Sequence, residues 1–270
     1  MSSIVIGLVV VSAGLHLSWN LLVRRYPGNL KFVWWLTLTG GIAAAASVLI
    51  LRIPIELDRV WPWLLGTIAA HAIYFTGLAR SYDGGDLGAV YPATRGGGIL
   101  GTTVLAWIAW DQHLSVLTLA GICMIAVLVA LPAMQAHWTV RTTLWTVVVA
   151  VTVAVYSTID NHGARLISPV VYIACQFLGA ALVLTPSALR EKSPLRWGPA
   201  TGAGVMSVVS YLLILYAYRQ ASAAPVLALR QIGIAAAPLV GWLVLREPLR
   251  RHALWISLGI AVGSALLIIG

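Results

Sequence analysis

The sequence predicts an all-α polytopic membrane protein with ten transmembrane helices arranged as two inverted five-helix repeats. The prediction comes from the composition, from the regular spacing of apolar runs and from a similarity between the two halves of the chain. Of the 270 residues, 60% are hydrophobic and only 9% are charged, whereas a soluble domain is about 25% charged. The mean hydropathy of +0.92 points the same way. This composition excludes a soluble enzyme, a disordered chain and a nucleic-acid-binding module, so we expect no nucleic-acid partner.

Apolar runs of roughly membrane-spanning length follow one another along the whole chain, separated by charged residues, Pro and Gly. About 20 apolar residues in a helix cross the roughly 30 Å hydrocarbon core of a bilayer. No basic segment precedes the first run and no clear cleavage site follows it, so we interpret it as a retained span and not as a signal peptide. The predicted spans are 4–23, 32–51, 61–80, 87–110, 115–133, 143–160, 169–189, 199–219, 223–245 and 252–270.

Basic residues are distributed unevenly among the short connections. Apart from Arg95 and Arg230, which lie inside spans, the connections after odd-numbered spans carry 11 Lys and Arg residues and those after even-numbered spans carry 4. Basic residues favour the cytoplasmic side of a membrane. We therefore expect a multi-pass protein of the inner or plasma membrane with both termini on the non-cytoplasmic side.

The two halves of the chain resemble each other at an offset of 135 residues. Six identities in 22 positions then align without a gap, and the paired Arg95 and Arg230 carry more weight than matches between small apolar residues. We predict two repeats, 1–135 and 136–270, with five spans each. Because five is odd, the repeats cross the membrane in opposite senses, which is a transporter architecture with its binding site between the halves.

One segment near the end of the chain carries a family signature. Residues 241–249 read Gly-Trp-Leu-Val-Leu-Arg-Glu-Pro-Leu, and Gly259 and Gly263 follow in the last span. Together they resemble the closing signature of EamA-type transporters, which belong to the drug/metabolite transporter superfamily. The first half departs from this pattern, since Gln112 stands where the second half has Glu247.

The N-terminal region agrees with this resemblance, because Trp19-Asn20 followed by Arg24-Arg25 is similar to the end of the first span in that family. The resemblance covers the whole ten-span plan. It implies a secondary transporter that moves small metabolites by alternating access. It does not fix the substrate, because the superfamily carries amino acids, amines, nucleotide sugars, phosphorylated sugars and vitamins.

Arg95 and Arg230 are the main candidates for a substrate site. A charge at bilayer depth costs about 2.5–3.5 kcal/mol on insertion scales, so it is kept where it faces a cavity or a partner. Arginine stays protonated and presents a planar fork of donors, which suits a carboxylate or phosphate group. Alternatively, each arginine caps a carbonyl group, extends to the interface, or pairs with a carboxylate near a helix end, such as Asp86 or Asp160.

The sequence around Arg95 allows two interpretations. Pro92 and three glycines, 96–98, flank it and can loosen the helix. A broken helix at this depth exposes backbone groups that line a site. Small residues equally allow close helix packing. In the second half, Gln231 could add an amide contact beside Arg230.

Further candidates for substrate contacts are polar or aromatic residues on shared helix faces. His16 and Asn20 lie four residues apart in the first span, and inter-helix hydrogen bonds are the alternative for them. The aromatic candidates could equally be core or part of an interfacial belt. Asp160 falls at a predicted helix end, and we expect it there and not buried. The remaining candidates are Trp19, His71, Tyr74, Tyr91, Tyr156 and Tyr211.

These features predict a transporter of a small organic anion or zwitterion and no enzyme, since neither a His-Glu-x-x-His nor a Gly-x-Ser-x-Gly motif occurs. The alternatives are an exporter of neutral or cationic metabolites or amino acids, and a lipid-head-group flippase. Cys123 and Cys175 stand alone, so no metal site or cofactor is expected. With no carboxylate predicted at mid-span, His16 or His71 could couple protons, and a uniporter or exchanger is favoured. Whether the chain forms a homodimer stays open.

Overall fold

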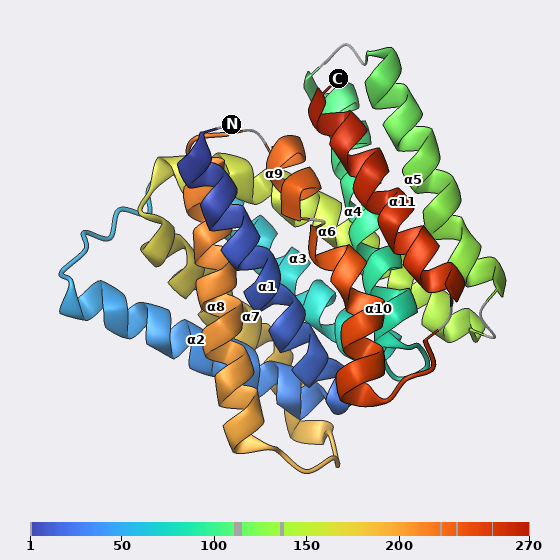
Figure 1. The fold of residues 1–270 in the computed structure, drawn as a ribbon. Coiled ribbons are helices and arrows are strands. Elements are labelled where there is room, and N and C mark those ends of the chain that lie inside the picture. The colour runs from blue at the N-terminus through green and yellow to red at the C-terminus, as the bar shows by residue number, and fades with distance from the viewer. Residues whose placement is uncertain are drawn as a thin grey trace.

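The computed structural model describes residues 2–110, 115–135, 138–221, 223–230, 232–249 and 251–269, and nearly all of them are helical (Figure 1). The helices are α1 (Ser3–Arg25), α2 (Leu30–Ile50), α3 (Trp61–Ser81), α4 (Leu87–Trp110), α5 (Val116–Gln135), α6 (Val140–Leu166), α7 (Pro169–Arg190), α8 (Trp197–Tyr218), α9 (Ala223–Arg230), α10 (Ile232–Leu245) and α11 (Arg251–Ile269). Each corresponds to one predicted span, except that α9 and α10 together make up the ninth.

Local sequence signals account for several helix starts. The side chains of Ser2, Asn29 and Thr139 each accept a hydrogen bond from a backbone N–H of the first turn that follows. Such capping satisfies N–H groups that have no partner within the helix. α3 and α7 have a proline in the first turn instead, where the missing N–H does no harm.

The helices pack in pairs that exchange between the two halves. α1 lies along α8, and α6 lies along α3, so the first helix of each half packs against the third helix of the other half. α2 packs against α7, and each of them also contacts the third helix of the other half, α2 with α8 and α7 with α3. This exchange is what two inverted repeats produce, and the predicted fold class is confirmed. The predicted boundary between residues 135 and 136 stays a prediction.

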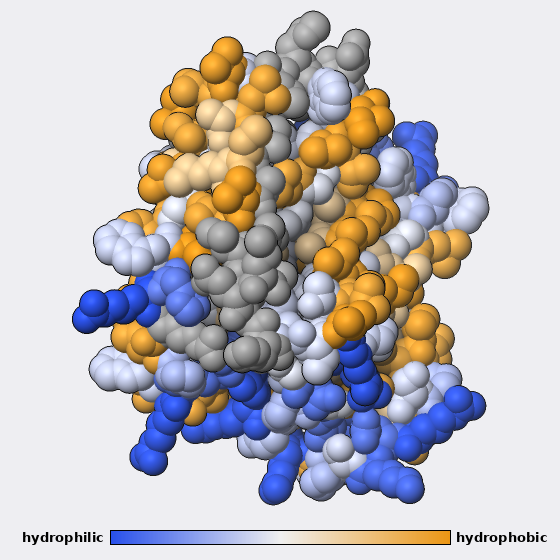
Figure 2. Space-filling view, turned by 90° about the vertical axis from the view of Figure 1, so that its right-hand side faces the viewer, coloured by the Kyte–Doolittle hydropathy of each residue, from blue (hydrophilic) through white to orange (hydrophobic). Residues whose placement is uncertain are grey.

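The outer surface has the character of a membrane protein. Within the described residues, five helices are long and apolar enough to cross a bilayer, namely α1, α2, α6, α7 and α8. Figure 2 shows hydrophobic side chains over the middle of the molecule and hydrophilic ones gathered at its lower end. Both termini lie at the upper end. The side of the membrane that each end faces remains a prediction.

α4 is one continuous helix from Leu87 to Trp110, with Pro92 inside it. Of the two interpretations of the sequence around Arg95, the broken helix is therefore not found. A Cβ atom added at Gly98 would lie 2.5 Å from Val153 Cγ1 on α6, and one added at Gly101 would lie 2.7 Å from Ala154 Cβ. These glycines allow α4 to approach α6 closely, which is the packing interpretation.

Candidate functional site

A small cavity lies between the two halves of the molecule. Its walls come from α1 and α3 of the first half and from α6, α7 and α8 of the second half, and its volume is about 20 Å³. That is room for roughly one water molecule, so the described residues are closed around this point. The lining residues are His16, Trp19, His71, Tyr74, Phe75, Tyr156, Phe177, Ser207 and Tyr211.

Arg95 lies in α4 next to this cavity, and its side chain is buried. Its Nη2 donates to Tyr74 Oη at 2.6 Å, and its Nη1 donates to Tyr156 Oη at 3.4 Å. The guanidinium carbon also lies 5.6 Å and 5.7 Å from the ring centroids of Tyr74 and Tyr91. Three tyrosines thus surround Arg95, two of them through hydrogen bonds to the phenol oxygen.

Arg230 lies in α9 and is equally buried. Its Nη2 donates to His16 Nδ1 at 2.9 Å and to Ser210 Oγ at 3.2 Å. The guanidinium carbon lies 5.9 Å from the ring centroid of Tyr211. The Nε and Nη1 atoms of Arg230 have no hydrogen-bond partner among the described residues.

The two arginine sites follow the same plan. Each arginine donates to the third helix of its own half, Tyr74 on α3 or Ser210 on α8. Each also donates to the first helix of the opposite half, Tyr156 on α6 or His16 on α1. The pseudo-symmetry seen in the sequence therefore extends to the contacts of the two side chains.

Among the described residues, neither arginine is paired with a carboxylate, because the ion pairs closer than 4.0 Å involve only Arg24. Pairing with Asp86 or Asp160, one of the alternatives for the arginines, is not found, because Asp86 pairs with Arg24 and Asp160 is bonded by phenol groups.

Each imidazole ring at the cavity is held in its neutral form. A guanidinium group has only donors, so His16 Nδ1 must accept the hydrogen bond from Arg230. His71 Nδ1 lies 3.0 Å from the Thr67 carbonyl oxygen and must donate to it, and its Nε2 then accepts from Gln176 Nε2 at 2.6 Å. A second ring proton would have to bind the accepting nitrogen of either histidine, where it would point at the donor group of Arg230 or Gln176.

The ten candidate residues that the structure describes form one connected cluster. His16 contacts Trp19 and Tyr91 through its ring and Asn20 through its Nε2, and Tyr156 contacts the rings of His71 and Tyr211. Gln231 lies outside the described residues. The sequence did not identify Phe75 and Phe177 in the cavity wall. The one available signal was that Phe75 follows His71 by one helical turn.

Asp160 is fully buried, which corrects the expectation that it lies at an exposed helix end. α6 continues to Leu166 and so carries Asp160 inside the bundle. Tyr172 Oη donates to Asp160 Oδ1 at 2.7 Å, and the Tyr211 hydroxyl donates to Asp160 Oδ2. A carboxyl group is therefore present inside the bundle after all.

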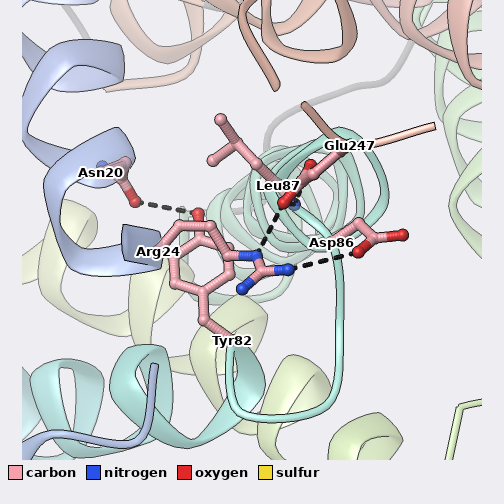
Figure 3. A network of polar contacts seen from close by, with 6 residues as sticks. All are labelled: Asn20, Arg24, Tyr82, Asp86, Leu87 and Glu247. Atoms are coloured by element: carbon pink, nitrogen blue, oxygen red, sulfur yellow. Dashed lines mark hydrogen bonds and ion pairs between the residues drawn. The ribbon is translucent and has the colours of Figure 1, made fainter. Parts of the chain in front are cut away.

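A polar cluster, which we call the latch, joins the two halves at the lower, hydrophilic end of the molecule (Figure 3). We call this end, where Arg24 lies, the basic end. Arg24 Nε lies 2.8 Å from Glu247 Oε1, and Arg24 Nη2 lies 3.3 Å from Asp86 Oδ1. The Leu87 N–H at the start of α4 donates to Glu247 Oε2 at 3.1 Å, where the helix dipole favours a negative charge. Burial raises the pKa of the Glu247 carboxyl, while the Arg24 guanidinium and the Leu87 N–H oppose that rise.

The opposite end of the bundle has a different contact at the matching position. An offset of 135 residues leads from Asp86 to Ala221, whose carbonyl oxygen accepts hydrogen bonds from Asn161 Nδ2 at 3.1 Å and Arg165 Nη2 at 3.0 Å. Gln112, the counterpart of Glu247, lies outside the described residues. Among the described residues, the ionic latch therefore belongs to the basic end alone.

Comparisons with known proteins agree with this architecture. Residues 140–270 match the EamA-like transporter family, and residues 30–125 match the Small Multidrug Resistance protein family. One solved structure, known only as "Crystal structure of protein", is similar to this chain with a TM-score of 0.70 and a sequence identity of 17%. The match covers 98% of this chain and 96% of that one. It supports the fold only. A sequence comparison with curated proteins gives no match. Because both matched families are transporters of one superfamily, the chain belongs to the drug/metabolite transporter superfamily and carries an EamA-like second half.

Proposed function

We propose that this transporter carries a small organic anion or zwitterion, which binds between the two halves through Arg95 and Arg230. The supporting observation is a pair of buried guanidinium groups without a carboxylate partner in the described residues. Arg95 Nε, Arg230 Nε and Arg230 Nη1 also lack hydrogen-bond partners there. Burying an unpaired charge is unfavourable, and a carboxylate or phosphate from a substrate would satisfy both arginines.

The aromatic and imidazole side chains of the cluster complete the proposed site. Tyr74, Tyr156 and Tyr211 line the cavity, and His16 accepts hydrogen bonds from Arg230 at its ring and from Asn20 Nδ2 at its carbonyl oxygen. These residues would contact the non-ionic part of the substrate. The cavity is too small for a metabolite in this conformation, so binding requires the halves to separate.

The proposed transport cycle is alternating access around this closed state. The latch closes the basic end, because Arg24 connects the end of α1 to the start of α4 and to the loop after α10. Asn20 lies one turn before Arg24 and accepts a hydrogen bond from Tyr82 at 3.2 Å. His16, Asn20 and Tyr82 thus link the Arg230 site to the region of the latch.

A thermal-shift screen of the purified protein tests the substrate class. The panel contains acetate, lactate, succinate, glutamate, inorganic phosphate and glycerol phosphate, with putrescine and glycerol as cationic and neutral comparisons. We expect stabilisation by at least one anion or zwitterion, weakened in Arg95→Gln and Arg230→Gln. Arg190→Gln, a change at an exposed arginine, is the matched control. Stabilisation by putrescine or glycerol alone, or full binding by both cavity variants, would contradict the proposal.

A further inference from the structure

Asp160 on α6 is a buried carboxyl group whose partners carry no positive charge. Hydroxyl groups of Tyr172 on α7, Tyr211 on α8 and Thr67 on α3 interact with it. No Lys, Arg or His nitrogen of the described residues lies within 4.0 Å of it. A carboxyl group bound only by hydroxyls can gain or lose a proton without breaking an ion pair.

The position of Asp160 connects it directly to the cavity. It follows Tyr156, which lines the cavity, by one helical turn, or about 6 Å along the helix axis. Tyr211 both lines the cavity and bonds to Asp160. A hydroxyl can donate and accept at once. Tyr211 can therefore pass its phenolic proton to Asp160 while it takes another from a hydronium ion in the cavity. The net result is that the carboxylate gains one proton, the hydronium ion becomes water, and Tyr211 remains a neutral phenol.

The two histidines of the cavity are poorer proton carriers in this state. His16 already accepts from Arg230, and His71 already accepts from Gln176. A proton on either acceptor nitrogen would create a contact between two donors. Asp160 has no such obstacle, because protonation makes it a donor to a hydroxyl oxygen that can accept.

The groups that face this part of the core decide how a proton on Asp160 affects an anion. The charged or titratable ones on the helices packed against α6 are His71 and Tyr74 on α3, Arg95 on α4, Tyr172 on α7, Tyr211 and Tyr218 on α8, and Arg230 on α9. Only the two arginines are permanently charged. An ionised Asp160 would repel an anion bound to them, and a protonated Asp160 would not.

We propose that Asp160, together with Tyr172 and Tyr211, is a proton-binding site and that the proton binds together with the anionic substrate. The coupling to an anion rests on the proposed function, whereas the binding of a proton at Asp160 does not. Proton and anion would then cross the membrane in the same direction. This proposal replaces the uniporter or exchanger that the sequence favoured.

Infrared spectroscopy of the purified protein tests the proton site without any substrate. Between about pH 4 and about pH 8, where protein carboxyl groups titrate, we expect a protonated-carboxyl band that appears on acidification. The band should be absent in Asp160→Asn, return in Asp160→Glu and change frequency in Tyr211→Phe. Glu247→Gln, which removes the buried carboxyl of the latch, should retain the band. A spectrum with no band that Asp160→Asn removes, or with an Asp160 band of constant size, would overturn the proposal.

Thermal shifts with succinate and with inorganic phosphate test the coupling. The probes lose charge themselves as the pH falls, and this affects the wild type and Asp160→Asn alike. Relative to Asp160→Asn at the same pH, stabilisation of the wild type should therefore increase as the pH falls. The same pH dependence in both proteins would remove the coupling and leave the anion transporter. If neither probe binds while the infrared band titrates, the proton site stands and the anion proposal is weakened. Size-exclusion elution and unfolding temperature show whether each variant is folded, and Asp160→Glu provides the test if Asp160→Asn is not.

Discussion

α4 and the α9–α10 pair are pseudo-symmetric, yet they hold their arginines differently. Both terminal nitrogens of Arg95 donate to phenol groups. Arg230 shares one nitrogen between His16 and Ser210, and has two nitrogens without a partner among the described residues. The repeat therefore provides two cations, of which Arg230 has more free donors for a ligand.

The two spans also differ in how closely they pack against their neighbours at a pair of matching glycines. A Cβ atom at Gly98 on α4 would lie 2.5 Å from Val153 Cγ1, whereas one at the matching Gly233 on α10 would lie 3.4 Å from the nearest atom, the Ala13 carbonyl oxygen. At these positions α4 therefore packs more closely against α6 than α10 packs against α1.

The largest expected effect is on anion binding by Arg230→Gln. Loss of one partner from a buried charged pair costs about 2–5 kcal/mol, so we expect binding of the anion found in the screen to weaken by roughly 30-fold to several thousand-fold. Arg95→Gln should weaken binding less, because two tyrosines already use its terminal nitrogens. Isothermal titration of both variants measures the difference. Equal losses would show that the two arginines contribute alike and would remove the functional contrast.

The second prediction concerns Glu247, which ties the loop after α10 to the start of α4. Glu247→Ala removes the ion pair with Arg24 and the acceptor for the Leu87 N–H. Hydrogen bonds to charged groups contribute about 1.5–3 kcal/mol each, so we expect opening at the basic end to increase by about tenfold or more. The measurement is the rate at which a thiol reagent labels a cysteine placed at Ser207 in the cavity wall, with Cys123 and Cys175 replaced by alanine.

Two outcomes of the labelling experiment separate the roles of Glu247. Glu247→Gln keeps an acceptor for the Leu87 N–H and should give an intermediate rate. Unchanged labelling in Glu247→Ala would mean that the latch does not hold the halves together at this end.

The third prediction compares the matched glycines through stability. Gly98→Ala should lower the free energy of unfolding by about 1–3 kcal/mol, the usual range for overpacking, because the new methyl group meets a β-branched side chain of a packed helix. Gly233→Ala should be close to neutral, since its new Cβ makes an ordinary contact. Thermal unfolding in detergent measures both variants. Similar destabilisation by the two substitutions would show that α10 is packed as firmly as α4.

Features that depend on local sequence could be predicted, and features that depend on contacts between distant segments could not. The ten spans and the two intramembrane arginines were apparent because apolar run length and isolated charges appear directly in the sequence. The burial of Asp160 was missed because the polar residues Asn161 and Arg165 suggested a helix end. α6 continues to Leu166 because neighbouring elements supply partners for that turn, including the Ala221 carbonyl group.

The latch illustrates the same limit. Arg24 and Glu247 both belong to segments that resemble a family signature, but their contact joins residues at opposite ends of the chain. It forms only when α1 of the first half meets the loop after α10 of the second half. Side chains that close a cavity, such as Phe75 and Phe177, likewise resemble any other apolar core residues in the sequence.

The smallest expected effect comes from Ser210→Ala, which removes one acceptor from Arg230. Ser210 Oγ also donates to the Ser12 carbonyl oxygen at 2.9 Å, so the substitution loosens the contact between α8 and α1 as well. Arg230 keeps its bond to His16, and a typical hydrogen bond contributes about 0.5–1.5 kcal/mol. We therefore expect anion affinity to change by roughly twofold to tenfold. Ser12→Ala, which removes the reciprocal α1–α8 hydrogen bond from Ser12 Oγ to the Ser210 carbonyl oxygen at 2.8 Å but leaves the Ser210 hydroxyl, is the control. If both variants change affinity equally, the Ser210 hydroxyl does not position Arg230.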